Sequence, residues 1–261
     1  DQLAGEETMP HMFTNRPRLY KLTGDSKDLR RQFWWETLNA MLYKLGGLVF
    51  IMGSILFFPA LDAYKNLGCW TFFLGSLLYL IVTIHDLAEV HYHWRTVDRH
   101  DQKAILEYIA SISYVLGTLL FTVGSVFFLS SGGLFIAGAW FFVIGSLLFV
   151  LGACINVLQI VHSRSLLTLQ LMNLTAVAFV VGSVLFTVAS VPFLWHFRSH
   201  LDQLVLNAFL AWQYLVGSVL FFMGGIFNYW RAYVLIRQEI AKQEGKPADI
   251  IGPWWNHELK G

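Results

Sequence analysis

The sequence predicts an all-α polytopic membrane protein, with six transmembrane helices arranged as three repeated antiparallel hairpins. Hydrophobic residues make up 56% of the 261 residues and charged residues only 13%, against about 25% charged residues in a typical soluble domain. Six apolar stretches are long enough to cross a hydrocarbon core of ~30 Å, which needs about 20 helical residues. A motif that recurs with a period of roughly 70 residues indicates one two-helix unit used three times.

We place the six spans at 38–61, 67–90, 105–129, 134–160, 167–194 and 204–235. Several spans exceed the minimum length, which predicts tilted helices or helices that extend beyond the membrane. The chain then divides into a polar N-terminal arm, three hairpin repeats and a polar C-terminal tail. Their bounds are 1–35 for the arm, 36–103, 104–165 and 166–235 for the repeats, and 236–261 for the tail.

Small residues recur within each predicted helix at a spacing of seven. Because seven residues make nearly two helical turns, these residues share one face of the helix. Helices in lipid associate through close packing of such small residues, so we expect tight hairpins, related by an approximate three-fold axis. A glycine-lined conduction path is the alternative. The predicted packing seam consists of Gly46, Gly53, Gly68, Gly75, Gly117, Gly124, Gly138, Gly145, Gly182 and Gly217.

The basic residues predict the orientation in the membrane. All but two of the 18 Lys and Arg residues lie on the side that carries both predicted termini, and the exceptions are Lys65 and Arg198. Cytoplasmic loops carry an excess of such residues, so both termini are expected on the positive-inside, cytoplasm-equivalent side. The basic stretches are short and mixed with acids, which argues against nucleic-acid binding.

One polar residue follows a motif glycine by eleven positions in each even-numbered span. These residues are Asp86, Asn156 and Asn228. Eleven residues make three helical turns plus about 20°, so each polar group shares the face of its glycine. Polar groups inside a membrane usually point into a bundle and bind one another. We favour hydrogen bonding to neighbouring helices for this polar intramembrane set, and an ion or proton path is the alternative.

The first repeat also carries His85, Glu89 and His93, which are spaced i, i+4, i+8 and line one helical stripe. Imidazole and carboxylate together can hold zinc or iron, so these three are candidate metal ligands. We favour a solvated helix end here and assign no metal or other cofactor. Nucleotide-binding loops, serine-nucleophile elbows and zinc-protease motifs are all missing from the sequence, so no catalytic residue is assigned.

The repeated motifs resemble those of the YrhK-like family of small membrane proteins. The resemblance is carried by Gly-x-x-x-Phe-x-x-Gly-Ser at 46–54 and by Gly-x-Trp-x-Phe-x-x-Gly-Ser at 68–76 and 138–146. It covers about 40–235 and implies a repeated two-helix membrane unit, without implying a settled activity. The third hairpin departs from the pattern, because Ala189 and Leu210 stand where glycines are expected.

Three functions compete. The favoured one is a non-catalytic integral membrane protein that acts as a scaffold or accessory subunit, in contact with the lipid bilayer and with protein partners or further copies of itself. The 16% aromatic content, the small-residue seams and the polar segments at both ends favour it. The second is a channel or transporter for a small ion or solute that uses Asp86, Asn156 and Asn228. The third is a metal-dependent membrane enzyme that uses the His85–His93 stripe.

Overall fold

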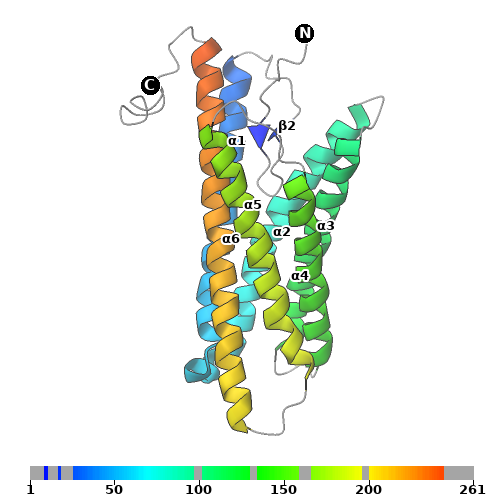
Figure 1. Ribbon diagram of the computed structural model, residues 1–261, viewed down its shortest axis with the longest axis vertical. Coiled ribbons are helices and arrows are strands. Elements are labelled where there is room, and N and C mark those ends of the chain that lie inside the picture. Colours follow the sequence, from blue (N-terminus) through cyan, green and yellow to red (C-terminus); the bar gives the residue numbers. More distant parts are fainter. Residues whose placement is uncertain are drawn as a thin grey trace.

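The structure, a computed structural model, describes residues 9–10, 17–18, 26–96, 102–129, 134–158, 166–195 and 200–243. Consecutive long helices run in opposite directions along one axis (Figure 1). All six are long and apolar enough to cross a membrane, which confirms the predicted helical class and the predicted number of helices of spanning length. They are α1 (Ser26–Leu56), α2 (Lys65–Thr96), α3 (Gln102–Phe127), α4 (Phe135–Leu158), α5 (Leu166–Ser190) and α6 (His200–Gln243).

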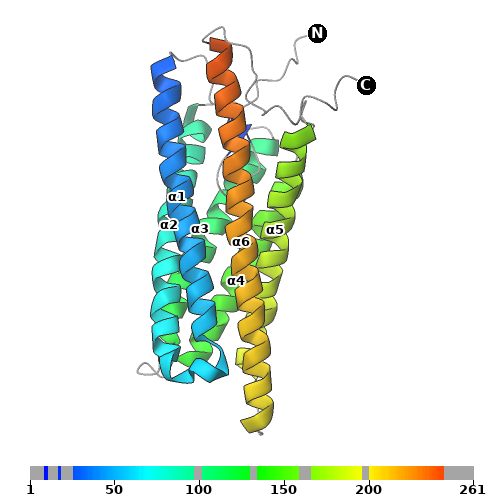
Figure 2. The same cartoon turned by 90° about the vertical axis from the view of Figure 1, so that its left-hand side faces the viewer.

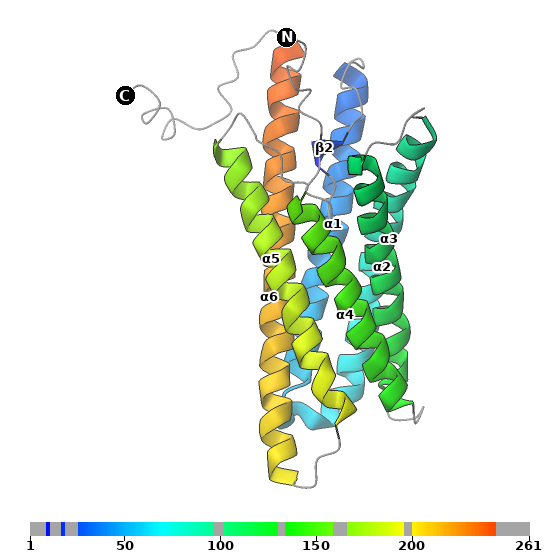
Figure 3. The same ribbon diagram turned by 45° about the vertical axis from the view of Figure 1, so that its right-hand side comes forward.

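The helices form a closed ring. Each helix contacts the next one along the chain, and α6 returns to contact α1. Across the ring, no long helices of the described part approach within 8 Å between Cα atoms. Figure 2 shows α1 and α6 on one side of the bundle, and Figure 3 shows α4 and α5 on another. The ring therefore closes between its first and last helices.

The bundle has two distinct ends. The start of α1 and the end of α6 lie at one of them, here named the terminal end (Figure 1). The opposite end, here named the loop end, carries two short 3-10 helices, η1 (Pro59–Tyr64) and η2 (Val191–Leu194). A proline stands in the first two positions of each. Proline lacks a backbone N–H and fixes φ near the helical value, so it suits a helix start and interrupts the helix before it.

Two helices reach further than the predicted spans. Helix α1 begins at Ser26, inside the stretch predicted as a polar arm, and α6 runs to Gln243, inside the predicted tail. A helix satisfies its own backbone hydrogen bonds, so it can continue into water after its apolar part ends. Within the remaining arm, strands β1 (Met9–Pro10) and β2 (Pro17–Arg18) pair antiparallel, with Met9 opposite Arg18.

Large apolar side chains cover the outside of the ring. Leu, Ile, Val, Phe and Trp side chains are exposed on all six helices, far beyond the single patches that a soluble monomer tolerates. Trp70, Trp140 and Trp212 occupy equivalent positions in the three hairpins and are 52%, 52% and 56% exposed. An apolar exterior of this extent fits an integral membrane protein, whose lipid-facing surface replaces the polar surface of a soluble protein.

Candidate functional site

Aromatic side chains fill the interior of the ring in a pattern that repeats in each hairpin. In every long helix, one aromatic residue stands three positions before a motif glycine and another stands four positions after it. All of them belong to one buried cluster. The odd-numbered helices contribute Tyr43, Phe50, Tyr114, Phe121, Phe179 and Phe186, and the even-numbered helices contribute Phe72, Tyr79, Phe142, Phe149, Tyr214 and Phe221.

These aromatic rings pack against the seam glycines. All ten predicted seam glycines are buried. A Cβ atom placed on Gly53 would lie 2.5 Å from Cδ2 of Phe72, and one placed on Gly46 would lie 2.5 Å from Cδ1 of Tyr79. We had expected helix backbones in close contact. The glycines make room for aromatic rings from the partner helix, and in the second and third hairpins the backbones also come close: a Cβ on Gly117 would lie 3.0 Å from the Gly145 carbonyl oxygen, and one on Gly182 would lie 3.2 Å from that of Gly217.

One layer of rings closes the centre of the bundle. Phe72, Phe142 and Tyr214 come from equivalent positions in the three hairpins, and each is at most 3% exposed. Their ring centroids lie 6.2 Å (72 to 142), 5.7 Å (72 to 214) and 6.4 Å (142 to 214) apart, within the range of favourable aromatic pairing. We call these three residues the aromatic triangle. Side chains from all three hairpins therefore meet in one layer inside the ring of helices.

Two cavities lie on the two sides of the aromatic triangle. The one towards the terminal end has a volume of about 20 Å³ and is lined mainly by phenylalanine rings from all three hairpins. The one at the loop end has a volume of about 60 Å³ and is also lined by all three hairpins. Its walls are mostly apolar, and Asp62, Lys65 and Asn207 are its charged or amide-bearing members. The two cavities share no lining residue.

The predicted polar intramembrane set is buried near the terminal end. Asp86, Asn156 and Asn228 are 2%, 2% and 1% exposed. Each forms a hydrogen bond with a residue of its own hairpin. The amide of Asn39 donates to Oδ1 of Asp86 at 3.3 Å, and the amide of Asn156 donates to the Tyr114 hydroxyl at 2.9 Å.

The third member of the set has a charged partner. Oδ1 of Asn228 accepts a hydrogen bond from the Arg231 guanidinium at 2.8 Å, one helical turn away on α6. Arg231 is only 1% exposed, although its position in the sequence indicates a cation at the membrane boundary. The repeat did contain a signal for a special role of Arg231, because this cation stands where the other two hairpins carry Glu89 and Gln159.

Hydroxyl groups link the hairpins to one another inside the ring. The Thr83 and Thr118 hydroxyls lie 3.1 Å apart between α2 and α3, and those of Ser54 and Ser218 lie 3.2 Å apart between α1 and α6. The Tyr43 hydroxyl donates to the backbone carbonyl of Phe221 at 3.1 Å. These buried contacts use polar atoms to hold neighbouring hairpins, as polar side chains commonly do between membrane helices.

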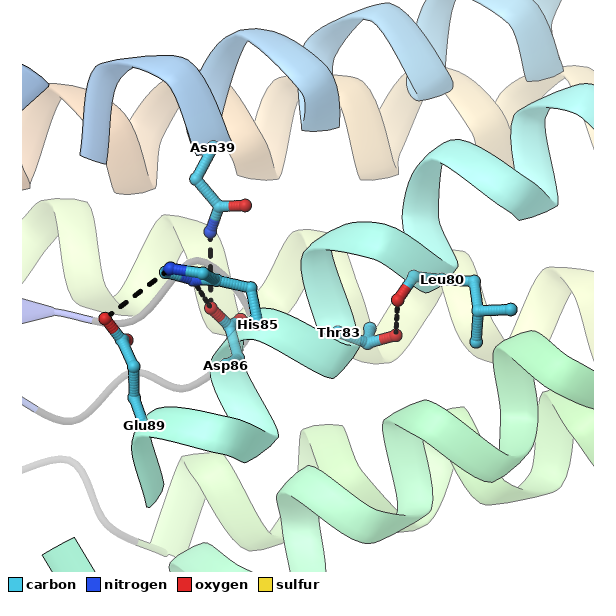
Figure 4. Close-up of polar contacts among 6 residues, drawn as sticks. All are labelled: Asn39, Leu80, Thr83, His85, Asp86 and Glu89. Carbon is cyan, nitrogen blue, oxygen red and sulfur yellow. Dashed lines mark hydrogen bonds and ion pairs between the residues drawn. The ribbon is translucent and has the colours of Figure 1, made fainter. Parts of the chain in front are cut away.

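The candidate metal ligands are partly brought together. Nε2 of His85 lies 3.8 Å from Oε1 of Glu89, and Nδ1 of His85 lies 4.0 Å from Oδ1 of Asp86 (Figure 4). Asp86 therefore joins a group that sequence analysis assigned to His85, Glu89 and His93. The side chain of His93 lies outside the described residues.

These observations define a class: a helical membrane protein whose hairpins enclose an aromatic core. Comparison with protein families matches the YrhK-like protein family twice, at residues 34–90 and at residues 104–161. The first two of the three predicted hairpins therefore match the YrhK-like two-helix unit in tandem, as the motifs predicted. Comparisons with curated proteins and with solved structures give no match.

Proposed function

We propose that this chain is a non-catalytic membrane scaffold or accessory subunit that acts through packing against lipid and partner helices. The observation that carries the proposal is the aromatic triangle of Phe72, Phe142 and Tyr214, which fills the bundle axis. A conduction path needs a wetted interior or a gate that opens to one, whereas this interior is packed with rings that sit on buried glycines.

The polar residues support the same proposal. Asp86, Asn156 and Asn228 each have a hydrogen-bonding partner within their own hairpin. The Asn39–Asp86 and Tyr114–Asn156 bonds join the two helices of their hairpins, as interhelical hydrogen bonds do in lipid, whereas the Asn228–Arg231 bond lies within α6. We therefore assign the polar intramembrane set a structural role. Asp86 is its unusual member, because its carboxylate replaces the amide found in the other two hairpins.

We further propose that the three hairpins are related by an approximate three-fold axis along the bundle, with both ends of the chain on the positive-inside side. Three equivalent interfaces between hairpins support this, namely α2 with α3, α4 with α5, and α6 with α1. Equivalent rings on equivalent glycines support it as well: Tyr79 on Gly46, Phe149 on Gly117 and Phe221 on Gly182.

The test compares ion flux in proteoliposomes that contain the unmodified protein or the Asp86→Asn variant. We expect no flux above protein-free liposomes from either protein. Flux through the unmodified protein that is lost in Asp86→Asn, with an unchanged melting temperature, would overturn the proposal and favour the channel. Asn156→Asp is the matched control, since it adds a carboxylate at the equivalent position of the second hairpin.

A second measurement addresses the accessory role directly. The native mass of the protein is determined after mild extraction from its own membrane at its natural abundance. We expect a mass well above that of the 29.8 kDa chain with its detergent, because a scaffold is found with its partners or with further copies. A free monomer that also shows no flux would contradict the accessory role.

A further inference from the structure

The terminal end of α2 carries a group of metal-binding side chains that the proposed function does not use. Single donor atoms of His85, Asp86 and Glu89 all lie within 4.8 Å of one another. Figure 4 shows the His85 ring between the two carboxylates, with Asn39 of α1 approaching Asp86. From this geometry we infer a binding site for a divalent first-row transition-metal ion, with His85, Asp86 and Glu89 as ligands.

The spacing of the donors suits such an ion. Ligand atoms in a tetrahedral site with bonds of about 2.0–2.1 Å lie roughly 3.4 Å apart. The His85 contacts with Glu89 at 3.8 Å and with Asp86 at 4.0 Å use different ring nitrogens, and one ion binds only one of them. One His85 nitrogen and one oxygen from each carboxylate lie within 4.8 Å of one another, so small side-chain rotations bring the three donors to a single ion. The i, i+4 spacing on one helix places these two donors on the same face.

Burial differs among the three ligands in a way that suits a site with a solvent-facing side. The side chains of His85 and Glu89 are 37% and 19% exposed, and that of Asp86 is 3% exposed. Asp86 supplies a carboxylate from inside the bundle, while the other two are partly exposed on its surface. Three protein ligands leave a coordination position for water.

A neighbouring residue of α1 orients the buried ligand. The Asn39 amide donates a hydrogen bond to Oδ1 of Asp86 at 3.3 Å, and Asn39 is itself only 6% exposed. Hydrogen bonds of this kind fix the orientation of a ligating carboxylate and raise metal affinity. The bond also joins α1 to α2, so an ion held here would tie the first hairpin together at its polar end.

The chemistry of the donors selects the class of ion. One imidazole and two carboxylates suit Zn²⁺, Fe²⁺ or Mn²⁺, whereas Mg²⁺ and Ca²⁺ prefer oxygen ligands alone. The other two hairpins offer no comparable group, because Gln159 and Arg231 stand at the position of Glu89, and Asn156 and Asn228 stand at the position of Asp86. The site is therefore a property of the first hairpin.

The test is Zn²⁺ binding to the purified full chain, without an affinity tag, measured by calorimetry and by metal analysis after dialysis. We expect about one Zn²⁺ per chain, with Mg²⁺ unable to compete. His85→Ala and Glu89→Gln should each weaken binding at least about tenfold. His91→Ala is the matched control on the same helix, since His91 contacts Tyr108 outside the group, at 3.3 Å from its hydroxyl.

Two further measurements keep the inference falsifiable if a variant folds poorly. Zn²⁺ should raise the melting temperature of the unmodified protein and of His91→Ala, and should leave that of the His85→Ala/Glu89→Gln double variant unchanged. X-ray absorption of the Zn²⁺-loaded protein should show one imidazole and oxygen ligands. Equal Zn²⁺ affinity in the unmodified protein and the double variant, or loss of binding in His91→Ala, would overturn the site and leave the scaffold proposal untouched.

Discussion

Replacing Gly225 with alanine tests whether the ring closes between α1 and α6 as described. A Cβ atom on Gly225 would lie 2.3 Å from Cε1 of Tyr43 and 2.4 Å from Cδ1. Tyr43 is fully buried and stacked on Tyr79, with ring centroids 4.7 Å apart. Its hydroxyl is bonded to the Phe221 carbonyl. The ring is held on two sides, so α6 itself must move away from α1.

The magnitude follows from the size of the overlap. Ordinary contact begins at 3.4 Å, so the Gly225 methyl requires a shift of about 1.1 Å, whereas a methyl on Gly75, at 3.2 Å from Phe50, requires about 0.2 Å. Overpacking of a rigid core typically costs about 1–3 kcal/mol. Alanine is favoured over glycine within a helix by about 1 kcal/mol at both positions. The two variants should therefore differ by about 2 kcal/mol in free energy of unfolding, with Gly225→Ala the less stable.

The assay is denaturation in mild detergent, followed by circular dichroism, for both single variants. The same measurement on Gly225→Ala in a Tyr43→Ala background isolates the contact. Without the Tyr43 ring, the Gly225 methyl has room, so it should cost nothing further. Equal stability of Gly225→Ala and Gly75→Ala, or an undiminished cost in the Tyr43→Ala background, would refute the described closure.

Three further predictions concern single contacts and topology. Thr83→Val removes one hydroxyl of the α2–α3 link and should lower the free energy of unfolding by about 0.6 kcal/mol. An unchanged free energy of unfolding in a denaturation experiment would show that the link does not stabilise the fold. The Tyr214 and Ser190 hydroxyls lie 2.8 Å apart, so Tyr214→Phe should lower the free energy of unfolding by about 1 kcal/mol. The ring itself fits, since phenylalanine occupies the equivalent positions, and a loss above 3 kcal/mol would contradict this. Cysteines introduced at Asp62 and Arg95, in a chain without its native cysteines, should react with impermeant reagents from opposite sides of the membrane; labelling from one side would contradict a membrane-crossing α2.

The broad architecture could be predicted because it depends on averages over many residues. Six apolar stretches of sufficient length predict six spans, and the period predicts hairpins. The interior was harder, because hydropathy cannot separate a lipid-facing side chain from a buried one when both are apolar. Phe50 and Phe72 stand inside the motifs that we identified, yet only the structure shows that their rings occupy the space left by glycines.

The sequence likewise predicts some of the polar contacts and leaves others unpredicted. The repeat pointed to Asp86, Asn156 and Asn228, because a polar residue recurs at one position of the unit. Asn39 gave no such signal, since Ala110 and Thr175 stand at its equivalent positions. Arg231 lies within the predicted span 204–235 but was counted only among the basic residues of the terminal side, because a cation near the end of a span is consistent with snorkelling as well as with burial. Individual pairings depend on which helices are neighbours, and the sequence does not state that α6 lies beside α1.

That neighbourhood of α1 and α6 has a consequence for how the protein can be assembled. Until α6 is in place, Tyr43 and Ser54 of α1 cannot make their contacts with Phe221 and Ser218, so the last helix completes the packing of the first. In the closed ring, the contacts of each hairpin depend on its neighbours around the ring and not on its place along the chain. A circular permutant that joins the end of α6 to the start of α1, and that begins and ends between α2 and α3, should therefore form the same ring of helices.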